Sequence, residues 1–107
     1  MSDGAERRKD LRIPVAARVI FREGSREEVW FTDNISEGGL YLKAEKPPFA
    51  GTMVNLEISV PNSDDLIKVK GEVMWRHEGR GCGVRFLRTT AQVRKTIQSF
   101  IEKAEEK

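Results

Sequence analysis

Residues 54–60, Val-Asn-Leu-Glu-Ile-Ser-Val, alternate apolar and polar side chains without interruption. Successive side chains of a β-strand point to opposite faces, so this pattern predicts a strand with one face in a core and the other in solvent. The same alternation returns over residues 67–75, Ile-Lys-Val-Lys-Gly-Glu-Val-Met-Trp, after the turn-rich residues 61–65. Two such strands joined by a short turn predict an antiparallel β protein.

Four further segments extend this pattern on both sides. Strands are predicted at residues 17–22, 29–32, 40–43 and 82–86, separated by stretches rich in Gly, Ser, Asn, Asp and Pro. In the last of them Cys82, Val84 and Phe86 form the inward set, and Trp75 is assigned to the core in the same way. A base-stacking role for Trp75 or Phe86 is the alternative to that assignment. The chain is therefore predicted to be mainly β, with six antiparallel strands in a small barrel.

After Leu87 the spacing of apolar residues changes from every second position to that of a helix. Apolar residues then recur at Val93, Ile97, Phe100, Ile101 and Ala104, which predicts an amphipathic C-terminal helix over residues 90–105. Thr89, with Gln92 three positions later, forms a possible capping box. The apolar stripe is expected to cover an open end or a flank of the barrel.

Two polar segments stand apart from this pattern. Residues 1–11 have almost no apolar side chains and are expected to form a flexible basic arm, leaving residues 12–107 as a single domain. Residues 32–39, Thr-Asp-Asn-Ile-Ser-Glu-Gly-Gly, are rich in side chains that bond their own backbone, and they predict a tight polar loop between two strands.

Composition excludes several classes of protein. The 107 residues are 38% hydrophobic and 34% charged, which is typical of one soluble domain. One cysteine and one histidine leave no internal disulfide and no conventional zinc site. A formal charge of +2 is too balanced for strong DNA or RNA binding. Without an apolar run or a signal-like start, the protein is expected to be cytoplasmic and not inserted in a membrane.

Enzymatic interpretations find little support. Ser36 has His77 as the only available imidazole and lacks a nucleophile-elbow context, so a serine hydrolase is not indicated. The glycine-rich residues 79–83 open a strand instead of a helix and lack the lysine of a P-loop. We therefore predict that the protein is not an enzyme and has no cofactor.

Two short motifs carry more information together than either does alone. Arg8 and Arg12 form Arg-x-x-x-Arg, with Arg7 directly before it, and residues 34–39 form Asn-x-Ser-x-x-Gly. In this order, on this strand pattern, they resemble the PilZ domain, the family of bacterial receptors for cyclic di-GMP. The resemblance extends to residues 71–75 and 83–86 and to the closing helix. It implies a PilZ-type six-stranded antiparallel β-barrel with a flexible N-terminal arm.

The chemistry of these residues fits such a ligand. An arginine can bond a phosphate or the O6/N7 edge of guanine, and its plane can stack on a base. Arg8 and Arg12 would stand roughly 13 Å apart in an extended arm or about 6 Å apart in a coiled one, and either span can straddle a dinucleotide. Asn34 and Ser36 offer short hydrogen-bonding side chains, and Gly39 allows close backbone approach.

The resemblance implies a specific mode of action. The arm would close over cyclic di-GMP held at Asn34, Ser36 and Gly39, and an arginine directly before the motif, here Arg7, goes with a stacked pair of ligands. The signal would then pass to an unidentified effector protein through the arm or the C-terminal helix. The expected species is a monomer or weak dimer.

Two other functions stay open at this point. One is a protein-interaction adaptor of the same fold, related to pili or motility, that does not use the ligand site. The other is a small nucleic-acid-binding barrel, which would need basic and aromatic residues interleaved along the strands.

Overall fold

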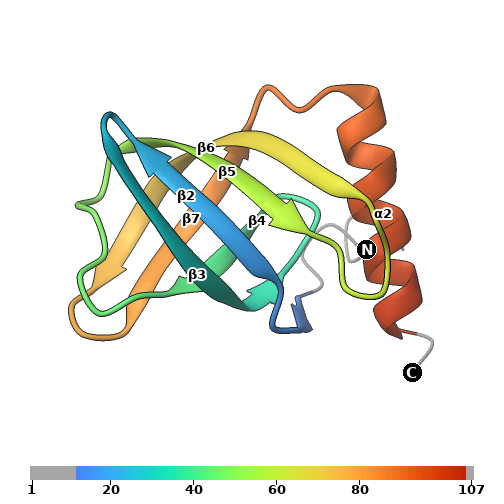
Figure 1. Ribbon diagram of the computed structural model, residues 1–107, viewed down its shortest axis with the longest axis horizontal. Helices are drawn as coiled ribbons and strands as arrows, with labels where there is room; N and C mark the ends of the chain where they lie inside the picture. The colour runs from blue at the N-terminus through green and yellow to red at the C-terminus, as the bar shows by residue number, and fades with distance from the viewer. Residues whose placement is uncertain (1–11, 106–107) are drawn as a thin grey trace, which may run out of the picture.

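The computed structural model describes residues 12–105, which form seven strands and one helix (Figure 1). In chain order these elements are β1 (Ile13–Pro14), β2 (Arg18–Glu23), β3 (Arg26–Ile35), β4 (Gly39–Lys43), β5 (Met53–Ser59), β6 (Leu66–His77), β7 (Gly81–Leu87) and α2 (Ala91–Glu105). All strand pairs are antiparallel. The predicted mainly β fold is confirmed.

The sheet closes on itself. Its strand order is β1-β3-β2-β5-β6-β7-β4, and an additional pairing of β3 with β4 joins the two ends. Six strands therefore form a closed barrel, as predicted, and the two-residue strand β1 pairs with β3 outside the ring. Closure leaves each strand of the ring with partners on both sides, so the barrel wall has no open edge.

Alternation fills the barrel with apolar side chains. The inward residues of β5 and β7 are buried, including Cys82, Val84 and Phe86 as predicted. Burial raises the pKa of the Cys82 thiol to about 11. The largest fully buried side chains are Phe21, Ile35, Leu40, Leu42, Leu56, Ile58, Ile67, Ile97 and Ile101.

Helix α2 covers one end of the barrel and packs against β6 and β1, whereas the β2–β3 turn lies at the other end (Figure 1). The helix buries Ile97, Phe100 and Ile101, so the predicted stripe does face the barrel. Its capping residue differs from the prediction. The amide of Val93 donates to Oγ1 of Thr90 at 3.1 Å, which places the cap one residue after Thr89.

The predicted loop over residues 32–39 is largely wrong. β3 continues to Ile35, and only residues 36–38 turn the chain. Thr32 is fully buried, and its hydroxyl accepts from the Ala17 amide at 2.9 Å and donates to the Val15 carbonyl. A polar side chain is tolerated inside the barrel here because both hydrogen bonds are made.

Candidate functional site

Residues from four strands form a row on the outside of the barrel. Asn34 of β3 lies opposite Tyr41 of β4, Tyr41 lies opposite Gly83 of β7, and Gly83 lies opposite Trp75 of β6. Directly opposed residues of an antiparallel pair point to the same side. The row therefore crosses the outer surface from Asn34 to Trp75 over roughly 14 Å, three interstrand spacings. We call this surface the β4–β7 face.

Trp75 does not belong to the core, and the prediction that it points inward is wrong. The β6–β7 pairing shifts register between Val73 and Trp75, so the strict alternation of β6 ends at Met74. Trp75 is 44% exposed. A Cβ on Gly83 would lie 2.3 Å from the indole of Trp75, so the ring covers the backbone of β7 at a position that only glycine leaves open. The stacking alternative for Trp75 is thus geometrically available.

Tyr41 occupies the centre of the row. Its hydroxyl is 2.9 Å from Nδ1 of His77, and the two rings are 5.9 Å apart between centroids. A Cβ on Gly81 would lie 2.0 Å from the Leu42 carbonyl oxygen and 2.9 Å from the Tyr41 ring. Glycines at positions 81 and 83 therefore let two aromatic rings lie close to the barrel wall.

Arg12 joins the row at its other end. Its Nη1 donates to Oδ1 of Asn34 at 2.6 Å in an exposed hydrogen bond. Asn34 in turn donates from Nδ2 to Oδ2 of Asp33 at 3.3 Å, and Asp33 lies 3.9 Å from the Lys43 ammonium. Asp33 stands where the β3–β4 register shifts. The structure thus brings the second arginine of the first motif to the first residue of the second motif.

Ser36 and Gly39 close the turn that follows. The Ser36 amide donates to the Gly39 carbonyl at 2.8 Å, and the Ser36 hydroxyl donates to the same oxygen at 3.3 Å. Ser36 is only 5% exposed. A Cβ on Gly39 would lie 2.2 Å from the Val84 carbonyl oxygen, so β4 approaches β7 too closely for any side chain. Both residues shape the turn beside Asn34.

Other arginines are placed differently. Arg85 pairs with Glu72 at 2.9 Å beside the row, on the outer face. Arg76 donates to the Pro47 carbonyl at 2.9 Å and lies over the Phe49 ring at 4.6 Å, so its guanidinium is directed toward another loop. Arg7 and Arg8 lie outside the described residues.

This arrangement suits a flat ligand with both anionic and hydrogen-bonding groups. Tyr41 and Trp75 offer ring surfaces, Asn34 offers an amide, and Arg12 offers a guanidinium that can bond a phosphate. Within residues 12–105, no three His, Cys, Asp or Glu side chains gather as metal ligands. No helix in that part of the chain is long and apolar enough to cross a membrane.

The sequence prediction did not place Tyr41 or Gly83 at the site, and it gave Trp75 a base-stacking role only as the alternative to a core position. A signal for Gly83 was present, since a glycine interrupts the apolar and polar alternation of β7. Tyr41 was recognised as a strand residue, but its place beside Asn34 and Gly83 depends on pairings between distant strands.

The fold and this face define a small β-barrel domain. Its outer surface is polar and aromatic beside Arg12, where the described chain begins. The sequence matches the model of the PilZ domain over residues 6–103. The chain belongs to the PilZ domain family.

Solved structures agree with this fold. The chain is similar to the Bacillus subtilis inhibitor of motility MotI/DgrA (TM-score 0.78, 19% identity), covering 91% of this chain and 51% of that one. It is also similar to the PilZ domain of CeSA from a cellulose-synthesizing bacterium (TM-score 0.72, 19% identity, 90% of this chain and 99% of that one). The chain is also similar to a third structure, the PilZ domain with c-di-GMP of YcgR from Escherichia coli (TM-score 0.75, 14% identity, 90% of this chain and 89% of that one).

The chain thus spans about half of MotI/DgrA and nearly all of the other two. A search of curated proteins finds no match.

Proposed function

We propose that this PilZ domain is a non-enzymatic receptor for cyclic di-GMP. Its site is the β4–β7 face, with Arg8 and Arg12 as a clamp and Asn34 as the group that reads a guanine edge. Ser36 and Gly39 hold the turn that positions Asn34. The observation that carries the proposal is the 2.6 Å contact between Arg12 and Asn34, which unites two motifs 22 residues apart in sequence.

The contact between Arg12 and Asn34 also suggests how the ligand enters. Both partners are on the surface, so their hydrogen bond competes with water and contributes little to stability. Cyclic di-GMP can replace it with two contacts: an ionic one between a phosphate and Arg12, and a hydrogen bond between a guanine edge and Asn34. Binding therefore exchanges an internal contact for ligand contacts without breaking any part of the core.

The row from Asn34 to Trp75 supplies room for the rest of the ligand. Guanine bases can stack on Trp75 or Tyr41, whose exposed surfaces attract any planar base. Arg8 adds a second guanidinium to the clamp. Arg7 supports binding of a stacked pair, in keeping with the family pattern noted from the sequence.

The receptor would act on an effector protein, in keeping with the mode of action that the family resemblance implies. Cyclic di-GMP would change the position of the arm relative to the barrel, and the effector would recognise the changed surface. The expected setting is the cytoplasm.

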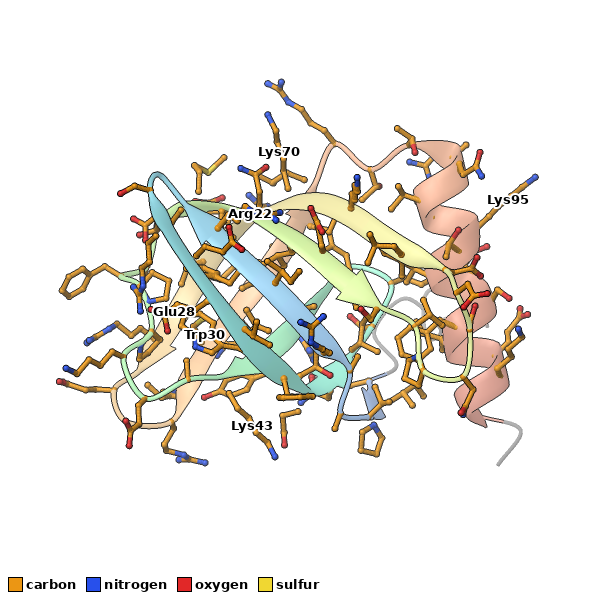
Figure 2. All side chains as sticks on the ribbon, in the orientation of Figure 1. Arg22, Glu28, Trp30, Lys43, Lys70 and Lys95 are labelled. Atoms are coloured by element: carbon orange, nitrogen blue, oxygen red, sulfur yellow. The ribbon has the colours of Figure 1, made fainter. Side chains whose placement is uncertain are left out.

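Calorimetric titration with cyclic di-GMP tests the proposal, with GTP and cyclic di-AMP as competitors of related chemistry. Saturable binding selective for cyclic di-GMP, lost in Arg8→Ala/Arg12→Ala, is the expected result, and its stoichiometry distinguishes one ligand from a stacked pair. Arg22→Ala is the matched control, because Arg22 lies on β2, outside the row from Asn34 to Trp75 and away from Lys43 (Figure 2). Absence of binding by a folded sample would refute the receptor and favour the adaptor function.

A further inference from the structure

A second surface of the barrel carries a groove that the proposed receptor site does not use. Its volume is about 440 Å³, and it lies between the outer faces of β2, β5 and β6 and the link from β7 to α2. Arg22 and Lys70, which line it, lie on the side of the barrel away from Lys43 of the β4–β7 face (Figure 2). Its lining residues are Arg22, Asn55, Leu56, Glu57, Lys68, Val69, Lys70, Leu87, Arg88, Thr89, Thr90 and Val93. We call it the basic groove.

Four cations and one carboxylate line the basic groove. Arg22 is paired, since its Nη1 lies 2.5 Å from Glu57 and its Nε lies 3.2 Å from Glu27. Those two acids raise the pKa of Arg22 through its hydrogen bonds with them. For Lys68, Lys70 and Arg88, the described part of the chain shows no ion pair. The groove therefore keeps a surplus of positive charge toward solvent.

Strand register concentrates this charge. Lys70 lies opposite Asn55 on β5, and Asn55 lies opposite Arg22 on β2, so these side chains form one row across three strands. Lys68 lies two residues from Lys70 on the same outer face of β6. Because neighbouring strands are about 4.8 Å apart, the cations stand close enough to act on one short segment.

Arg88 adds an independent observation. Its φ is 51°, in the left-handed region that asparagine and glycine adopt far more readily than arginine does. Arg88 belongs to the link between β7 and α2 and lines the basic groove. An arginine at a backbone position that disfavours it is an outlier of the kind that gathers at binding sites.

The groove also has an apolar component. Val69 is 9% exposed, and Leu87 and Val93 are partly buried beside it. Thr89 and Thr90 add hydroxyl groups at the start of α2. A molecule bound in the basic groove would thus contact both its cations and the apolar side chains that line it.

We propose that the basic groove binds an acidic segment of the effector protein, with an apolar side chain flanked by aspartate or glutamate. The charge surplus selects carboxylates, and the surface of Val69, Leu87 and Val93 accepts the apolar side chain. Aromatic residues are absent from the described lining and Glu57 is present in it, so the groove does not have the composition of a nucleic-acid channel.

The inference rests on the proposed function, because it names the surface through which the receptor contacts its effector. β6 links the two surfaces: its residues Lys68 and Lys70 line the basic groove, and its residue Trp75 ends the row of the β4–β7 face. Ligand and effector can therefore be bound at the same time, toward opposite ends of the outer face of one strand.

A synthetic peptide, acetyl-Glu-Asp-Leu-Glu-Glu-amide, is the probe, and its counterpart with Gln and Asn in place of the acids is the control. Titration into the ¹⁵N-labelled full chain is followed by amide chemical shifts. The expected result is saturable shifts at Lys68, Lys70 and residues 87–90, absent with the neutral peptide. Lys68→Gln/Lys70→Gln should weaken binding about fivefold, in line with two partly solvated ion pairs.

A matched control exists on α2. Lys95 and Lys103 line a smaller hollow of about 190 Å³ that also contains Asp65. Lys95→Gln/Lys103→Gln removes the same charge and should leave peptide binding within about twofold. Arg88→Asn should weaken binding while keeping the fold, because asparagine suits the backbone at that position.

Three results would overturn the proposal. One is that both double lysine substitutions weaken peptide binding equally, which would mean that the peptide is attracted by the net charge of the protein and not by the groove. Another is a DNA oligonucleotide that binds the same residues more tightly than the peptide. The third is self-association of the chain through these residues with no shift from the peptide. Peptide binding together with a failed cyclic di-GMP titration would support the groove and refute only the receptor function.

Discussion

The β4–β7 face and the basic groove are built from the same barrel but by different means. On the β4–β7 face, glycines 81 and 83 let Tyr41 and Trp75 lie against the wall, and its cations Lys43 and Arg85 face carboxylates. In the basic groove, lysines stand on the strands and the link to α2 forms one side. One face is an aromatic surface beside Arg12, and the other is a hollow with unbalanced charge.

This difference shows how one closed barrel can carry two unlike surfaces. Residues at alternate positions are committed to the core, so only the outward half of each strand can vary. The outward half of β6 changes character along its length, from Lys68 and Lys70 to Trp75. The two surfaces thus need no second domain, and the predictions below test whether they are independent.

The largest effect is expected from Gly39→Ala. The new Cβ would stand 2.2 Å from the Val84 carbonyl oxygen, so β4 or β7 must move. We expect a loss of about 2–3 kcal/mol in the free energy of unfolding, measured by urea denaturation. Gly38→Ala is the control, because nothing lies within 4 Å of a Cβ there. Equal costs for the two variants would show that the close approach of β4 to β7 is not required.

Arg12→Ala should affect the β4–β7 face alone. Charge-assisted hydrogen bonds contribute about 1.5–3 kcal/mol, so affinity for cyclic di-GMP should fall about ten- to a hundredfold. Stability should hardly change, since the bond from Arg12 to Asn34 is exposed. Calorimetry with a parallel denaturation curve measures both quantities. A clear loss of stability would make Arg12 a structural residue, and weaker peptide binding in the basic groove would show that the surfaces are coupled.

Gly83→Ala should change the aromatic row without opening the core. Its Cβ would meet the Trp75 indole at 2.3 Å, and the half-exposed ring can swing away. We expect affinity for cyclic di-GMP to fall several-fold, in keeping with about 1 kcal/mol or more for base stacking. Trp75 emission, recorded with Trp30 replaced by Phe in both proteins, should shift to the red. Unchanged affinity would remove Trp75 from the site.

The smallest change at neutral pH is expected at Cys82, inside the wall between the two surfaces. Burial raises the pKa of its thiol to about 11, against 9.0 for a free thiol. Between these values the unfolded chain loses the proton first, so stability should fall as pH rises from about 9 to about 11. At pH 7.5 a thiol reagent should react slowly, with and without cyclic di-GMP. Faster reaction with ligand would mean that the barrel itself opens.

Most of the fold could be predicted from alternation alone. Apolar residues at every second position predict the six barrel strands, and apolar residues at helical spacing predict the helix. These patterns are clear because one closed core fixes which residues point inward. The predictions failed where the register shifts, at Asp33 and near Met74. A bulge adds one residue to one strand, and nothing in the local composition marks it.

The candidate site was predicted in part for the same reason. Arg12 and Asn34 came from a motif, and the structure places them in contact. Tyr41, Gly83 and Trp75 join Asn34 only through pairings of β4, β7 and β6, which are distant in sequence. Ser36 is buried within its turn, and a sequence shows the residue type but not the exposure of its hydroxyl.

The buried hydroxyl of Thr32 has a consequence for the rate of capture. It fixes the chain at Val15 and Ala17, so the backbone is anchored a few residues after Arg12. Covalent geometry then keeps the Cα of Arg12 within about 11 Å of the Cα of Val15. Confinement to that radius corresponds to an effective concentration on the order of 0.1 M. A nucleotide held at Asn34 would thus meet the Arg12 guanidinium without a search through bulk solvent.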